Sequence, residues 1–173
     1  IFEWQTKIYS KRMNIKKLNI LLADDDTDDC LFFKEALEAM PVITQFKAVH
    51  DGEVLMQLLN RKTEQLPHVL FLDLNMPRKN GFECLAEIKH HEKLKTLPVV
   101  IFSTSYEQEV VNLLYNGGAQ YFIRKPSEFA MFKKIIFHVL TLITQDLLNG
   151  HVKNIIQPAR ENFVLTVEDI LTI

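Results

Sequence analysis

The chain alternates between short apolar runs and longer segments in which apolar residues recur at helical spacing. Short runs rich in Val, Ile, Leu and Phe are typical of buried strands, whereas a period of three to four residues is typical of helices packed on one face. The predicted strands are Leu18–Ala23, Ile43–Val49, Val69–Leu72, Val99–Phe102 and Ala119–Ile123. The predicted helices are 27–40, Asp51–Asn60, Phe82–His91, Tyr106–Tyr115 and Ser127–Leu148. This alternation indicates βαβ units, right-handed crossovers and a parallel sheet.

The ends of the helices carry capping signals. Asp26 or Thr27 is a suitable N-cap for the first helix, because a short polar side chain can accept a hydrogen bond from a free backbone N–H. Pro41 is expected to end that helix, since proline disfavours a helical conformation in the residue before it. Asn116-Gly117 is a typical C-terminal signal for the fourth helix.

We assign the repeated pattern to one domain over residues 16–148. Residues 1–15 match none of its elements and are expected to be an N-terminal extension, with the native domain beginning near Met13. Residues 149–173 form a C-terminal tail that is too short for a separate output domain. The tail contains the apolar run Phe163-Val164-Leu165, which could pack on its own domain or bind a partner, and packing on its own domain is the favoured interpretation.

Composition adds mainly exclusions. Hydrophobic residues make up 47% of the chain and charged residues 24%, as in ordinary soluble domains. A net charge of −2 gives no reason to expect nucleic-acid binding. No apolar stretch approaches the roughly 18–20 residues of a membrane span, and no secretory signal is present, so we expect a cytoplasmic protein. Cys30 and Cys84 lie within helical patterns and are expected to be buried, reduced thiols.

Polar residues that could carry chemistry follow four of the predicted strands. They are Asp24-Asp25-Asp26 after the first strand, Asp73 after the third, Ser103 after the fourth and Lys125 after the fifth. The carboxyl ends of parallel strands share one edge of the sheet, and open α/β sheets bind their ligands at that edge. The order of the strands therefore predicts that carboxylates, a hydroxyl and an ammonium group converge there.

Each of these residues alone has a purely structural explanation. Acidic residues at a helix N-terminus cap free N–H groups and interact favourably with the helix dipole, and we assign only this role to Asp28 and Asp29. Together, however, the residues form the set that an aspartyl-phosphate requires. A carboxylate such as Asp73 can attack phosphorus. A divalent cation then offsets the repulsion between oxygens, while groups such as Lys125 and Ser103 bind the phosphoryl oxygens.

The strings ILLADDD, VLFLDLNMPRKNGFECLAEIK, PVVIFSTS and GGAQYFIRKP resemble the receiver domain of bacterial two-component response regulators. The motifs stand in the order and at the spacing of that family, over about residues 17–148. The resemblance implies a doubly wound, flavodoxin-like α/β fold with a five-stranded parallel sheet of order 2-1-3-4-5. The second string also resembles the small stand-alone regulators that partner phytochrome-type and other hybrid kinases.

The resemblance implies a phosphoacceptor and a metal site. Asp73 would accept a phosphoryl group from a phosphohistidine of a sensor histidine kinase or a histidine phosphotransfer protein. Mg²⁺, or Mn²⁺ in its place, would be bound by Asp25 directly, by Asp24 through water, by Asp73 and by the main-chain carbonyl of Asn75. Asn75 and Ser105 occupy the positions that tune the dephosphorylation rate in this family.

The resemblance also implies a switch. Ser103 would be the switch hydroxyl, Phe122 the switch aromatic residue and Lys125 the partner of the phosphate. Ser103 replaces the commoner threonine but keeps the hydroxyl, whereas Phe122 lacks the hydroxyl of the frequent tyrosine. Their movement would change the surface formed by the fourth helix, the fifth strand and the fifth helix. That surface is expected to bind a downstream protein or a second copy of the chain, and neither nucleic acid nor a membrane is an expected partner.

Two alternatives belong to other functional classes. A Mg²⁺-dependent phosphohydrolase would also form an aspartyl-phosphate, but it would carry a second acidic residue two positions after its nucleophile, where this chain has Asn75. A pseudo-receiver would bind partners without being phosphorylated. We expect a signalling switch that assists only its own phosphorylation and dephosphorylation, rather than an enzyme acting on other substrates.

Overall fold

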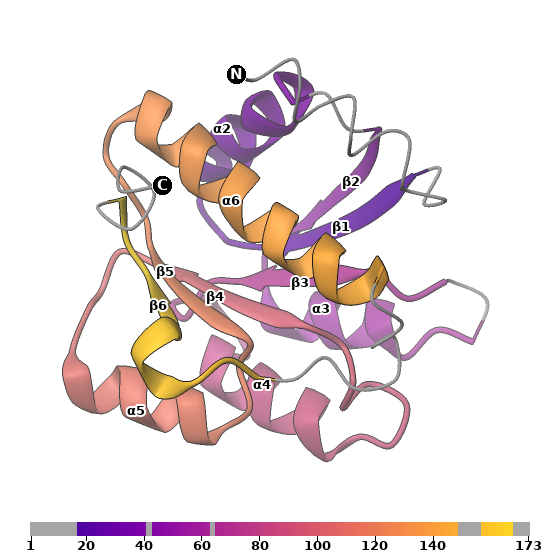
Figure 1. Cartoon of the computed structure of the whole chain (residues 1–173). Helices are drawn as coiled ribbons and strands as arrows, with labels where there is room; N and C mark the ends of the chain where they lie inside the picture. Colours follow the sequence, from indigo (N-terminus) through magenta and orange to yellow (C-terminus); the bar gives the residue numbers. More distant parts are fainter. Residues whose placement is uncertain (1–16, 41–42, 63–64, 149–156, 168–173) are drawn as a thin grey trace.

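A parallel β-sheet forms the centre of the molecule (Figure 1). The computed structural model describes residues 17–40, 43–62, 65–148 and 157–167. In this part of the chain the sheet has six strands in the order β2-β1-β3-β4-β5-β6. The strands are β1 (Leu18–Ala23), β2 (Thr44–Val49), β3 (Val69–Leu72), β4 (Val99–Ser103), β5 (Tyr121–Arg124) and β6 (Val164–Leu165).

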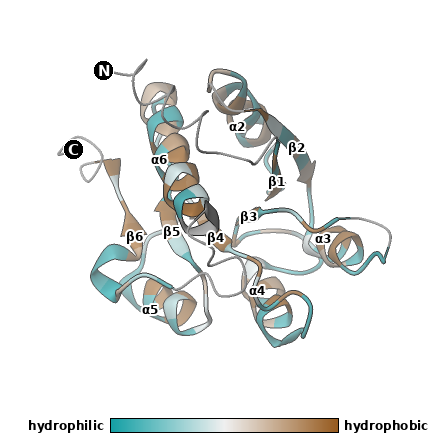
Figure 2. Ribbon diagram, turned by 45° about the vertical axis from the view of Figure 1, so that its right-hand side comes forward, coloured by the Kyte–Doolittle hydropathy of each residue, from teal (hydrophilic) through white to brown (hydrophobic). Residues whose placement is uncertain are grey.

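Helices cover both faces of this sheet (Figure 2). They are α2 (Thr27–Glu38), α3 (Gly52–Leu59), α4 (Gly81–His90), α5 (Gln108–Asn116) and α6 (Phe129–Leu148). Helices α2 and α6 pack on one face, while α3, α4 and α5 pack on the other. This is the doubly wound arrangement expected from alternating strands and helices. No helix in the described ranges is long and apolar enough to cross a membrane.

The prediction of five strands is wrong by one. The predicted order 2-1-3-4-5 is present, and β6 lies beyond it as an additional parallel strand beside β5. The other predicted elements are confirmed with ends that differ by up to two residues, and Asp26 is the N-cap of α2. The predictions for Pro41 and for residues 1–15 fall outside the described residues.

The core under α2 and α6 is built around one aromatic side chain. The ring of Phe33 on α2 is fully buried, and its centroid lies 4.7 Å from that of Phe71, 5.8 Å from that of Phe102 and 6.1 Å from that of Phe132. All three pairs have the edge-to-face geometry that aromatic quadrupoles favour. This cluster holds β3 and β4 against both helices of that face.

The two central strands are buried on both faces. Every residue of β3 and of β4 is buried, as expected for parallel strands covered by helices on each side. Backbone hydrogen bonds continue past the strand ends, from the amide of Asp73 to Ala23 O and from the amide of Lys125 to Ser103 O, at 2.9 Å each. The residues that follow the strands are therefore held level with one another along one edge of the sheet.

The C-terminal segment 157–165 adds the last strand. It comprises residues 157–159, the 3₁₀ turn Arg160–Asn162, Phe163 and β6. In β6, Val164 pairs with Phe122 and Leu165 pairs with Ile123, and the amide of Phe122 donates to the carbonyl oxygen of Phe163 at 2.9 Å. The apolar run of the tail thus packs on its own domain.

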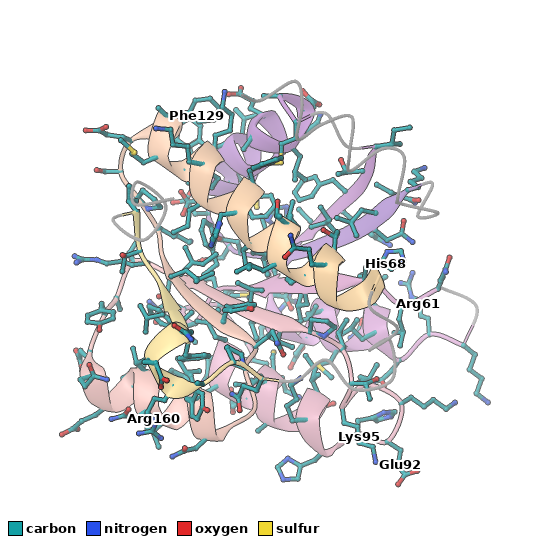
Figure 3. The ribbon with its side chains drawn as sticks, in the orientation of Figure 1. Arg61, His68, Glu92, Lys95, Phe129 and Arg160 are labelled. Carbon is teal, nitrogen blue, oxygen red and sulfur yellow. The ribbon has the colours of Figure 1, made fainter. Side chains whose placement is uncertain are left out.

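Side chains fasten this segment to α5 as well. Phe163 is fully buried, and its ring stands edge-on to that of Tyr115 with the centroids 5.1 Å apart. The hydroxyl of Tyr115 donates to Pro158 O at 3.1 Å, and the side-chain amide of Gln157 donates to Tyr115 O at 2.7 Å. The guanidinium of Arg160 lies over the Tyr115 ring, 5.0 Å from its centroid, at the side of the molecule that carries α5 (Figure 3).

Candidate functional site

Three carboxylates meet at the carboxyl edge of the sheet. One ligand oxygen from each of Asp24, Asp25 and Asp73 lies within 4.8 Å of the others. Asp24 and Asp73 are buried and Asp25 is exposed, so the cluster opens to solvent on one side. Carboxylate oxygens are the ligands that Mg²⁺ and Mn²⁺ prefer, and the charge of three anions requires a cation nearby. The cluster therefore fits a divalent metal ion.

Burial controls the ionisation of Asp24. Its side chain is 1% exposed, and this desolvation raises its pKa to about 6. The ammonium of Lys125 and the backbone N–H of Asp26, which donates to Asp24 Oδ1 at 3.0 Å, act in the opposite direction but do not compensate fully. A buried carboxylate with this pKa is stabilised in its charged form by any further cation that enters the pocket.

The carboxylate of Asp73 is held between two donors. Its Oδ2 atom accepts a 2.7 Å hydrogen bond from the amide of Asn75, and its Oδ1 atom lies 3.4 Å from the ammonium of Lys125. The backbone behind it is closely packed, because a Cβ atom added to Gly81 would clash with the carbonyl oxygen of Asp73 and stand 2.8 Å from the Cα atom of Leu74. Glycine at this position thus lets the start of α4 lie directly against the acidic residue.

The loop that follows Asp73 is fixed by an ion pair. Arg78 adopts a left-handed backbone conformation, with φ of 65°, which non-glycine residues adopt rarely. Its guanidinium pairs with the carboxylate of Asp51, the N-cap of α3. The hydrogen bond from the Val54 amide and the pairing with Arg78 lower the pKa of Asp51. The ion pair therefore fastens the loop that carries Asn75 to a neighbouring helix.

Lys125 contacts more carboxylates than the sequence predicted. Its Nζ atom lies 2.6 Å from Asp24 Oδ2, 2.8 Å from Asp29 Oδ2 and 3.4 Å from Asp73 Oδ1, and its side chain is 7% exposed. Burial by itself lowers the pKa of Lys125, but the hydrogen bonds to Asp24 and Asp29 and the nearby negative charge outweigh it, so the net pKa is raised. The ammonium stays charged and is shared among three anions.

Asp29 is the site residue that sequence reasoning missed. We predicted for it only a role at the helix N-terminus, yet Asp26 makes the capping hydrogen bonds of α2 and the Asp29 carboxylate faces Lys125. The sole hint in the sequence is its place in the first turn of a helix that begins at the acidic cluster.

The predicted switch residues lie next to this cluster. Ser103 is fully buried, and its hydroxyl oxygen accepts a 3.3 Å hydrogen bond from the amide of Ser105. The ring of Phe122 on β5 is also fully buried, and the ring of Tyr106 approaches it edge-on, with the centroids 5.9 Å apart. The structure therefore brings the four strand-end positions together, with the aromatic side chain turned inward beside them.

Comparisons with known proteins agree with this geometry. The family profile described as response regulator receiver domain matches residues 20–137. The response regulator Rcp1 of Synechocystis sp. is 33% identical over 110 residues, which are 61% of this chain and 75% of Rcp1. The probable methanogenesis regulatory protein FilR2 of Methanothrix harundinacea is 27% identical over 120 residues, which are 68% of this chain and 77% of FilR2.

Solved structures show the same fold. The phosphorylated cyanobacterial phytochrome response regulator RcpA is similar with a TM-score of 0.69 and 29% identity, over 74% of this chain and 94% of RcpA. The Mn²⁺-bound form of Rcp1 has a TM-score of 0.64 and 25% identity, over 82% of this chain and 99% of that chain. The profile covers more than half of this chain. The chain belongs to the response regulator receiver domain family.

Proposed function

We propose that this protein is a response regulator that is switched by phosphorylation of Asp73. One carboxylate oxygen of Asp73 attacks the phosphorus of a partner's phosphohistidine, the P–N bond breaks, and its electron pair leaves with the imidazole, which takes up a proton. The observation that carries the proposal is the convergence of Asp73 with two further carboxylates and Lys125 at one edge of the sheet. An aspartyl-phosphate needs both kinds of group.

A divalent cation completes the proposed site. Asp24, Asp25 and Asp73 would hold Mg²⁺ or Mn²⁺, together with the main-chain carbonyl of Asn75. When bound, such an ion offsets the charge of the phosphoryl oxygens and of the carboxylates. The close grouping of the three carboxylates supports this assignment, as does the Mn²⁺-bound form of the relative Rcp1.

Lys125 and Ser103 would bind the transferred phosphoryl group, and Phe122 would change position in response. Lys125, already 3.4 Å from Asp73 Oδ1, would pair with a phosphoryl oxygen, and the Ser103 hydroxyl would donate to another. Ser103 leaves its present contact with the Ser105 amide as it moves. The ring of Phe122 would move into the space that Ser103 vacates, since a packed core responds to such a shift by repacking rather than by leaving a void.

The signalling surface would comprise α5, β5 and α6. In this protein the segment 157–165 covers β5, so a partner meets this segment between the two helices. The phosphoryl donor would be a sensor histidine kinase or a histidine phosphotransfer protein of the cytoplasm. The relative RcpA is described as a phytochrome response regulator, which favours a phytochrome-type kinase as the donor. The receiver of the signal would be a separate protein or a second copy of the chain.

The test is direct phosphorylation by a small donor. The protein is incubated with acetyl phosphate and Mg²⁺, and its intact mass is measured alongside that of Asp73→Asn. An added phosphoryl group that survives acid, is released by base and is absent in the variant supports the proposal.

Two other results would contradict it. A folded protein that gains no phosphoryl group and hydrolyses nothing would be a pseudo-receiver. Rapid turnover of many phosphate esters would make the protein a phosphohydrolase.

A further inference from the structure

All the nearby anions compete for one ammonium group. Lys125 Nζ carries three N–H groups, and three carboxylates lie at 2.6, 2.8 and 3.4 Å from it. The ammonium group hydrogen-bonds to Asp24 and Asp29, so it can move toward a phosphoryl oxygen on Asp73 only by lengthening one of these two bonds. The free-energy cost of phosphorylation depends on which of these contacts Lys125 loses.

The three carboxylates differ in how easily Lys125 can leave them. The side chain of Asp24 is 1% exposed, so water cannot replace the ammonium there, and Asp73 itself carries the phosphoryl group. The side chain of Asp29 is 27% exposed, at the start of α2, and its carboxylate is outside the group of three that could hold a metal ion. Water can solvate Asp29 once the ammonium moves away, which makes it the least costly partner to lose.

We propose that Asp29 is a positioning residue that holds Lys125 in the unphosphorylated protein and competes with the phosphoryl group for it. The inference rests on the proposed phosphorylation of Asp73. Because the contact between Asp29 and Lys125 exists only before phosphorylation, it stabilises that state, and its removal favours the state in which Lys125 binds the phosphoryl oxygens. Asp29 thus sets how readily the switch turns on, without touching phosphorus or metal.

The variant Asp29→Asn tests this competition, and Asp28→Asn is its matched control. Both changes remove one negative charge from the same helical turn, but Asp28 is exposed. Beryllofluoride, a mimic of the phosphoryl group, is titrated at saturating Mg²⁺ into the full chain, and its dissociation constant is measured by calorimetry. We expect Asp29→Asn to bind about three- to tenfold more tightly than the parent protein, the range of one partly exposed charge-assisted hydrogen bond. Asp28→Asn should remain within about twofold.

Salt and a conservative variant separate this contact from general charge effects. In high salt the small effect of Asp28→Asn should vanish, while that of Asp29→Asn should persist because Lys125 is buried. Asp29→Glu keeps the anion and should bind like the parent protein. Unchanged or weaker binding by Asp29→Asn, or equal effects of the two Asn variants, would overturn the inference. A folded parent protein that binds no beryllofluoride would overturn the proposed function as well.

Discussion

The backbone amide of Phe122 donates a hydrogen bond of 2.9 Å to the carbonyl oxygen of Phe163. The first residue is the expected switch aromatic on β5, and the second is the buried anchor of the segment 157–165. Any displacement of β5 at Phe122 therefore acts on that segment before it reaches a bound partner. The segment lies on the proposed signalling surface, beside β5.

Phe163→Ala should loosen the segment 157–165 from β5. The ring is fully buried against Tyr115, and loss of a buried phenyl group costs about 3–5 kcal/mol when the rest of the structure cannot relax. We expect the segment to detach while the remaining sheet stays folded, so the global free energy of unfolding should fall by less than this. The clearest measurement is hydrogen exchange at the Phe122 amide, which should lose its protection.

Glu161→Ala is the control for this prediction. Glu161 lies in the same segment but is exposed, so its removal should leave exchange at Phe122 unchanged. Retained protection of the Phe122 amide in Phe163→Ala would show that the strand pairing alone holds the segment.

Gly81→Ala should disturb Asp73. The new methyl group would clash with the carbonyl oxygen of Asp73, so either α4 or the acceptor loop must move. Overpacking of this kind costs about 1–3 kcal/mol, which urea denaturation can measure. We also expect slower phosphorylation by acetyl phosphate. Gly117→Ala is the comparison, because its added Cβ would lie 3.2 Å from the nearest atom; equal effects of the two substitutions would contradict the assigned role of Gly81.

Binding of a divalent cation should release a proton in mildly acidic solution. Because burial raises the pKa of Asp24 from 3.8 to about 6, the metal-free protein holds a proton there between these pH values, whereas the unfolded chain does not. Protonation of Asp24 therefore favours the folded state at low pH, and this contribution to the free energy of unfolding is lost as the pH rises through about 6. A bound cation displaces the proton.

Calorimetry in buffers of different ionisation enthalpy measures this release. Binding of Mn²⁺ should release a proton at pH 5.5 and none at pH 7.5. Asp25→Asn should still show the release, and Asp24→Asn should abolish it. A proton count that does not change between the two pH values would contradict the raised pKa.

Both cysteine thiols should be slow to react in the folded protein. Burial raises the pKa of Cys30 to about 12 and that of Cys84 to about 11, and nearby carboxylates add to the effect. Since the thiolate is the reactive form, a disulfide reagent at pH 8 should modify neither residue rapidly until urea unfolds the chain. Rapid labelling of one thiol in native protein, assigned with Cys30→Ser, would indicate local opening of its helix.

The sequence predicted those elements whose signal is local. The runs of β3 and β4 are apolar throughout because both faces are buried, and the runs are long enough to recognise. The two residues of β6 carry no such period, because their strand conformation results from pairing with Phe122 and Ile123. Asp29 was misjudged for a related reason, since its partner Lys125 lies 96 positions away in the chain.

The folded domain extends further along the chain than the segment that matches the family profile. The family match ends at residue 137, within α6, whereas the paired strands continue to Leu165. A recombinant protein that stops at residue 148 would leave one side of β5 without its hydrogen-bonding partner and the ring of Tyr115 uncovered. Such an open, apolar edge is a common starting point for aggregation. For expression, crystallisation or fusion to a reporter, the carboxyl boundary of this domain therefore belongs beyond residue 167.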